Sequence, residues 1–188
     1  MNQIEKYLST YFTIQEDKLS SVAAHFERVV LKRGELILRT GQYCKKMFFI
    51  ESGILRVSAL NDGKDITQWI ATEGQFGTDL NSFMLNQPAR WNIEAITDAT
   101  LYFISKSDYD TIGTVIPNWP ELEKIFLVNC FTTMENRIFQ FLSLNSEERY
   151  LRFFHNNKRL FNQVPLKYLA SMLGMTAETF SRIRKKNS

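Results

Sequence analysis

The sequence predicts an α+β chain in which an antiparallel, jelly-roll-like β-roll is followed by a long helix and a small C-terminal helical domain. Short β-branched and aromatic runs, separated by glycines, fill the stretch between Val29 and Ile104. Closely spaced short strands of this kind are typical of an antiparallel barrel or roll. The chain then lacks glycine and proline between Pro120 and Pro165. Finally, residues 145–188 carry nine Lys or Arg against three Asp or Glu, which predicts a polyanionic partner at this end.

The N-terminal part, residues 1–117, is expected to hold helices and then the β-roll. Apolar residues recur at three- and four-residue steps through residues 2–26, which predicts helix there. The run N-D-G at 61–63 predicts a hairpin turn, because these residues tolerate a positive φ. Hydrophobic residues make up 44% of the chain, with fifteen Phe, so a sizeable core is affordable.

A long helix is expected over residues 118–144, with an apolar seam along one side. A helix of this length between a β domain and a basic end is typical of a dimer helix, and we predict a homodimer. The alternative is that the seam packs on the chain's own β domain. Ser146 is expected to cap the next helix. The predicted dimer contacts are Leu122, Ile125, Phe126, Asn129 and Thr133.

The C-terminal domain, residues 145–188, has the internal logic of a helix-turn-helix. The small side chain of Ala170 lets two helices cross closely, and Gly174 makes the corner between them. Thr176 is expected to cap the second helix, with Phe180 and Ile183 facing inward. The outward residues are polar, small or cationic, as is typical of side chains that bond bases and phosphates. The predicted DNA-binding residues are Thr176, Ala177, Glu178, Thr179, Ser181, Arg182, Arg184, Lys185 and Lys186.

The run L-A-S-M-L-G-M-T-A-E-T-F-S-R-I resembles the recognition element of the Crp/Fnr family of bacterial transcription regulators. The runs K-R-G-E, M-F-F-I-E-S-G-I-L-R-V and E-G-Q-F-G-T-D-L resemble that family's cyclic-nucleotide-binding-type β-roll. The resemblance covers about residues 26–186, and it implies a winged-helix-like domain that reads double-stranded DNA as a homodimer. It assigns base or phosphate roles to Thr176, Glu178, Thr179 and Arg182. Ala177 departs from the pattern, because many relatives carry a long basic residue there, and any β-wing must lie near residues 157–164.

The same resemblance places an effector pocket in the β-roll, with departures from the phosphate cassette of the family's cyclic-nucleotide binders. Asp79 would replace a ribose-binding Glu, but it is shorter and displaced by one residue. Arg90 stands one residue beyond the expected arginine, and Trp91 borders the pocket. We therefore predict a degenerate cyclic-nucleotide site that binds another small effector, not cyclic AMP, or none; a bulge at Pro88 would instead return Arg90 to the pocket. The candidate pocket residues are Gly77, Thr78, Asp79, Leu80, Ala89, Arg90 and Trp91.

Other chemistries have little support in the sequence. Cys44 and Cys130 are too few for an iron–sulfur cluster, and His25 and His155 lie in no ligand motif, so no metal, cofactor or enzyme activity is expected. No apolar run is long enough for a membrane span, and the N-terminus lacks the layout of a signal peptide, which predicts a cytoplasmic protein. A second hypothesis remains: a small-ligand-binding β-roll whose C-terminal helices contact protein rather than DNA.

Overall fold

The computed structural model describes residues 1–187. Two helices, α1 (Gln3–Phe12) and α2 (Glu16–Ala23), precede the strands, so the helix predicted over residues 2–26 is broken. The break falls at Thr13, which ends α1 in the left-handed region with φ 53°. Helix α1 begins with a capping box, in which the Asn2 side chain accepts from the Glu5 backbone N–H and the Glu5 carboxylate accepts from that of Asn2.

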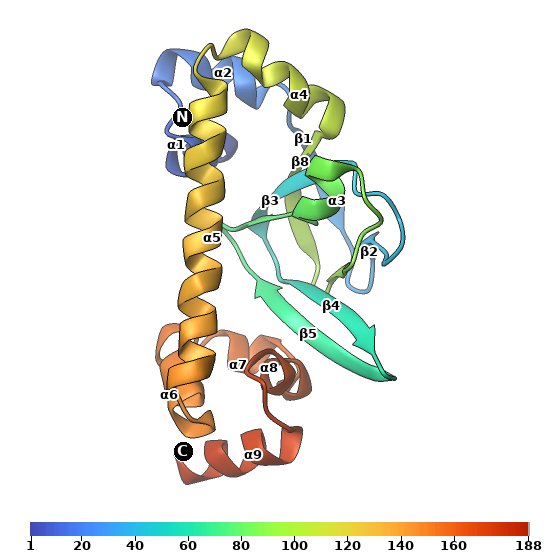
Figure 1. Cartoon of the computed structure of the whole chain (residues 1–188), viewed down its shortest axis with the longest axis vertical. Coiled ribbons are helices and arrows are strands. Elements are labelled where there is room, and N and C mark those ends of the chain that lie inside the picture. Colours follow the sequence, from blue (N-terminus) through green and yellow to red (C-terminus); the bar gives the residue numbers. More distant parts are fainter. Residues whose placement is uncertain (188) are drawn as a thin grey trace.

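The β-roll consists of two antiparallel sheets that face each other (Figure 1). One sheet has the strand order β1-β8-β3-β6 and the other β2-β7-β4-β5. The predicted turn at 61–63 is confirmed, because Asp62 and Gly63 both have positive φ between the paired strands β4 and β5. The strands are β1 (Glu27–Leu31), β2 (Leu36–Leu38), β3 (Lys46–Ser52), β4 (Leu55–Asn61), β5 (Lys64–Ala71), β6 (Phe76–Gly77), β7 (Asn92–Ala95) and β8 (Ala99–Ser105).

Short helices α3 (Leu80–Leu85) and α4 (Lys106–Val115) flank the β-roll, and the chain then enters α5 (Trp119–Ser143). In Figure 1, α5 runs along the molecule from the N-terminal helices, past the β-roll, to the C-terminal helices. This confirms the long helix and the α+β fold class predicted from the sequence. No helix within residues 1–187 is long and apolar enough to cross a membrane.

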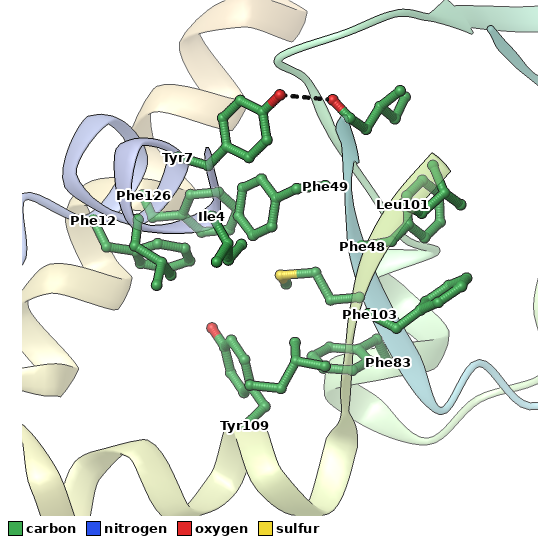
Figure 2. Close-up of a cluster of buried hydrophobic side chains, with 14 of the residues drawn as sticks. Ile4, Tyr7, Phe12, Phe48, Phe49, Phe83, Leu101, Phe103, Tyr109 and Phe126 are labelled. Atoms are coloured by element: carbon green, nitrogen blue, oxygen red, sulfur yellow. Dashed lines mark hydrogen bonds between the residues drawn. The ribbon is translucent and has the colours of Figure 1, made fainter. Parts of the chain in front are cut away.

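An aromatic core fixes α1 and the first half of α5 to the β-roll (Figure 2). The Phe12 and Phe126 rings stack with their centroids 4.5 Å apart, and the Phe76 ring meets Phe126 edge-on at 4.7 Å. Phe126 is only 1% exposed and Leu122 is also buried in this core. The prediction that Leu122 and Phe126 make dimer contacts is therefore wrong: these two side chains hold α5 on its own β domain.

The C-terminal helices are α6 (Ser146–Asn156), α7 (Leu160–Gln163), α8 (Leu166–Met172) and α9 (Ala177–Lys186). Asn145, not Ser146, caps α6: its side chain accepts from the backbone N–H groups of Glu147 and Glu148. The β-wing expected near residues 157–164 is absent from the described chain, because Leu160 and Phe161 form α7 and bury their side chains. A β-wing at these positions would leave the side chains of Leu160 and Phe161 exposed to water.

A second core joins the C-terminal helices to the β-roll. Tyr150, Phe161 and Phe180 supply its aromatic rings, with the Tyr150 and Phe180 centroids 5.2 Å apart. Buried isoleucines from the β-roll enter the same cluster: Ile54, Ile70 and Ile96. The helix-turn-helix is therefore packed directly against the β-roll in this structure.

Candidate nucleic-acid interface and effector cavity

Helices α8 and α9 meet at a corner that Gly174 makes possible. Gly174 has φ 67°, and a Cβ there would lie 2.6 Å from Cε1 of Phe141 on α5. Only glycine satisfies both the left-handed backbone and this close approach. The corner closes with a hydrogen bond from the Met175 N–H to the Ala170 carbonyl, 3.0 Å long. Ala170 is buried, as its predicted role at the helix crossing requires.

Helix α9 presents its polar residues to solvent. Thr176 caps it, accepting from the Thr179 N–H at 3.2 Å, and Phe180 and Ile183 bury its inner face. The exposed side chains on the outer face are those of Ala177, Glu178, Ser181, Arg182 and Lys185. The structure thus places these five residues as predicted, and leaves Thr179 half-buried at the end of the cap.

Glu178 lies in the first turn of α9 as an ionised acceptor. A hydrogen bond from its own backbone N–H, then one from the Thr176 hydroxyl, lowers the pKa of its carboxyl. A carboxylate at this end of a helix is favoured by the helix dipole. It can only accept hydrogen bonds, which suits an amino group on a base edge and opposes a phosphate.

The three basic residues at the end of α9 lie in different surroundings. Lys186 donates to the Glu147 carboxylate of α6 at 2.9 Å, and this bond is the first cause of the lowered pKa of Glu147. Lys185 is exposed, and Arg184 is half-buried beside Tyr150. A surface ion pair of this kind is screened by solvent, so Lys186 is restrained only weakly.

A cavity of about 560 Å³ lies between the β-roll and α5. Its apolar walls come from β4, β5 and β7, and α5 closes one side with Cys130, Thr133 and Met134. Ala89 is not part of the lining: it is buried, and its backbone bonds Gln42 and Gly41 instead. The predicted pocket residues that do line the cavity are Gly77, Thr78, Asp79, Leu80, Arg90 and Trp91.

Both carboxylate oxygens of Asp79 accept hydrogen bonds from backbone N–H groups. Asp79 is 2% exposed; one carboxylate oxygen accepts from the Ser82 N–H at 3.0 Å and the other from the Arg90 N–H at 2.8 Å. It therefore caps α3 and ties the following loop to it. The Arg90 side chain is exposed beside Trp91, with its guanidinium 5.5 Å from that ring centroid, and both side chains border the cavity.

Helix α5 leaves a row of apolar side chains uncovered on its side away from the β-roll. Thr133, predicted to lie in a dimer seam, is exposed and lines the cavity, while Ile125 belongs to the uncovered row. Sequence reasoning missed Val128, Phe131 and Phe139, although the three- and four-residue spacing of the row is visible once the buried side of α5 is known. The exposed apolar residues are Ile125, Val128, Phe131, Ile138, Phe139 and Leu142, interrupted by Thr132 and Glu135.

The two thiols lie in unreactive surroundings. Cys44 is buried, and burial raises the pKa of the half-buried Cys130 thiol to about 11. Within residues 1–187, no group of three or more His, Cys, Asp or Glu is placed to hold a metal ion. His155 uses Nδ1 to bond the Leu151 carbonyl oxygen, and His25 lies 3.8 Å from Asp108.

Residues 28–112 match the family model of the cyclic nucleotide-binding domain. The comparison with curated proteins gives no match. Among solved structures, the chain is similar to the global regulator CLP of Xanthomonas campestris, described as c-di-GMP responsive: TM-score 0.71, 16% identity, 92% of this chain and 91% of that chain. FixK2 from Bradyrhizobium japonicum matches with a TM-score of 0.73 and 16% identity, over 86% of this chain and 83% of that chain. The catabolite activator protein of Thermus thermophilus matches with a TM-score of 0.58 and 18% identity, over 92% of this chain and 83% of that chain.

Proposed function

We propose that this chain, which has the fold of the Crp/Fnr-type regulators and contains a cyclic nucleotide-binding domain, is a sequence-specific DNA-binding transcription regulator that acts as a homodimer. The observation that carries the proposal is the outer face of α9, where Glu178, Ser181, Arg182 and Lys185 are exposed above a buried Phe180. A helix-turn-helix presents its second helix to the major groove, and this face carries the side chains that read it.

Four residues of α9 have roles that their chemistry supports. The Arg182 guanidinium bonds O6 and N7 of guanine, and the Glu178 carboxylate accepts from a cytosine amino group. Lys185 and Lys186 contact phosphates and make the affinity depend on salt, because phosphate contacts release counterions. Lys186 must give up its bond to Glu147, at little cost, to do so.

The dimer is supported by the uncovered apolar row of α5. Leu122 and Phe126 hold α5 on its own β-roll, so the row from Ile125 to Leu142 is available to the same row of a second copy. Two helices packed along such rows bury apolar side chains that are otherwise in water. A two-fold dimer would set two copies of α9 about 34–36 Å apart, in successive major grooves of a palindromic site.

The cavity between the β-roll and α5 is the proposed effector site. An occupant would touch Cys130, Thr133 and Met134 of the helix that carries the dimer contacts, which gives a physical route from ligand to dimer geometry. The bonds of Asp79 to Ser82 and Arg90 support a degenerate cyclic-nucleotide site, because its oxygens are turned to the backbone. We therefore expect another small effector, or none.

A gel shift on the protein's own promoter region, over a range of salt, tests the DNA role. Arg182→Ala is compared with wild type and with Lys64→Ala. Lys64 is an exposed cation on the β4–β5 hairpin, so this control variant loses the same charge. We expect Arg182→Ala to lose about tenfold or more for a specific site, and Lys64→Ala to lose none. Absence of any shift at low salt would favour protein contacts by the C-terminal helices instead.

Titration calorimetry tests the effector site separately. Cyclic AMP and cyclic GMP are the direct probes of a working cyclic-nucleotide site, and c-di-GMP is added because one similar structure is described as responsive to it. Saturable heat with cyclic AMP at micromolar concentration would contradict the degenerate site.

A further inference from the structure

A second cavity, of about 390 Å³, lies where β5, α5, α6 and the end of α8 meet. It shares Trp69, Gln75 and Thr133 with the effector cavity, but otherwise has its own walls. Its lining includes the aromatic rings of Trp69, Phe141 and Phe153 and several side-chain amides. It also includes three arginines and, among the described residues, no acidic side chain. The arginines are Arg137, Arg149 and Arg152.

Arg137 is a cation withdrawn from water, and residues 1–187 supply no counterion to it. Burial lowers the pKa of its guanidinium, and the one hydrogen bond it donates within the described residues goes to the Met172 carbonyl oxygen at 3.2 Å. Its guanidinium lies 5.1 Å from the Trp69 ring centroid and 5.6 Å from that of Phe141. Burial of an unpaired charge is costly, so an anion that reached this guanidinium would be held strongly.

The other two arginines add to the same positive potential. Arg149 donates to the carbonyl oxygens of Leu173, at 3.0 Å, and Leu144, at 2.7 Å, which fixes its guanidinium at the cavity wall. Arg152 is exposed at the cavity edge. Within residues 1–187, no carboxylate lies within 4.0 Å of any of the three guanidinium groups, so their charges reinforce one another in the cavity.

We propose that this cavity binds a small organic anion with a planar ring, its acidic group against Arg137 and Arg152 and its ring against Trp69. The volume lies in the range of small-molecule sites, and the amides of Gln75, Asn136 and Gln140 can bond polar atoms on the ring edge. A carboxylate and a phosphate offer the same chemistry to a guanidinium. The proposal concerns a site beside the effector cavity, and it does not rest on DNA binding.

An occupant of this site would contact the β-roll through Trp69, the long helix through Arg137 and the C-terminal helices through Arg152. It would therefore favour the arrangement in which the C-terminal helices are docked on the β-roll. A ligand that binds one arrangement better than another shifts the population toward it by its difference in affinity.

Titration calorimetry on the full chain tests the proposal with four probes. Benzoate and AMP combine a ring with an anion and separate a carboxylate from a phosphate. Benzamide keeps the ring without the charge, and inorganic phosphate keeps the charge without the ring. We expect saturable binding of benzoate or AMP at one site per chain, and much weaker heat from both controls.

Three variants locate the site. Because hydrogen bonds to charged groups are among the stronger ones, Arg137→Gln is expected to weaken the binding about tenfold or more. Arg152→Gln is expected to weaken it several-fold, and Arg90→Gln, at the effector cavity, to leave it unchanged. If Arg137→Gln disturbs folding, Arg152→Gln decides, because its side chain is exposed. No binding of benzoate or AMP at millimolar concentration, or binding lost in Arg90→Gln and kept in Arg152→Gln, overturns the proposal.

Discussion

The guanidinium of Arg56 on β4 lies 3.8 Å from the ring centroid of Tyr168 on α8. Arg56 is 4% exposed. Its guanidinium donates hydrogen bonds to the carboxylates of Asp65 and Glu94 and to the Thr67 hydroxyl, at 2.6, 3.2 and 2.8 Å. One strand along, the Thr67 N–H donates to the Ser171 hydroxyl of α8 at 2.9 Å. The hairpin β4–β5 therefore holds the first helix of the helix-turn-helix through a polar clasp beside the shared isoleucine core.

Tyr168→Ala removes the ring from this clasp and leaves the Arg56 network in place. A desolvated cation–π contact and the lost packing are together worth about 1–3 kcal/mol, so the free energy of unfolding should fall by that amount. Tyr168→Phe keeps the ring and should stay close to wild type. Urea unfolding followed by tryptophan fluorescence gives the comparison. Equal losses in both variants would place the effect in the hydroxyl and not in the ring.

Asp79 is expected to matter for folding more than for ligand chemistry. Asp79→Ala leaves the buried N–H group of Ser82 and the partly buried one of Arg90 without their acceptor, which should destabilise the chain by about 2–4 kcal/mol. Asp79→Asn keeps one acceptor oxygen and should lose less. Urea unfolding measures both. A variant that keeps full stability would contradict the structural role that we assign to this carboxylate.

The C-terminal helix-turn-helix could be predicted from sequence because its determinants are local. Thr176 as cap, Gly174 as corner and Phe180 and Ile183 as inner residues all act within a few positions of one another. Even there the prediction of a wing failed, because α7 forms when Phe161 packs against Tyr150 and Phe180, which a reading of residues 157–164 alone does not reveal.

Predictions that depended on distant contacts were less secure. Leu122 and Phe126 lie in an apolar seam that the sequence shows, but the spacing of the seam does not reveal which residues bury it. Phe12 of α1 and Phe76 of β6 cover Phe126 in the structure, and neither is near it in the chain. For the same reason Asp79 read as a ligand residue: its acceptor role depends on the Arg90 N–H, eleven residues further on.

The uncovered row of α5 gives a test of the dimer. Phe139→Asp and Leu142→Asp each place a charge in the row, and an unpaired charge buried between two helices is costly, so each variant should be monomeric where wild type is dimeric. Leu60→Asp is the matched control, because Leu60 is an equally exposed apolar residue on the β4–β5 hairpin. Light scattering after size exclusion measures the mass. A dimer that survives both α5 variants would move the interface elsewhere.

Cys130 reports on the effector cavity through its reactivity. Only the thiolate reacts with iodoacetamide, and burial raises the pKa of this thiol to about 11, so its fraction of thiolate at pH 8 is about 0.001. In a Cys44→Ser background the alkylation rate should rise about tenfold per pH unit up to about pH 11. Mass spectrometry follows the modified fraction with time. A rate that levels off near pH 9, in the ordinary pKa range of a thiol, would contradict a buried Cys130. An effector bound in the cavity should slow the reaction at every pH, because Cys130 is part of the cavity wall.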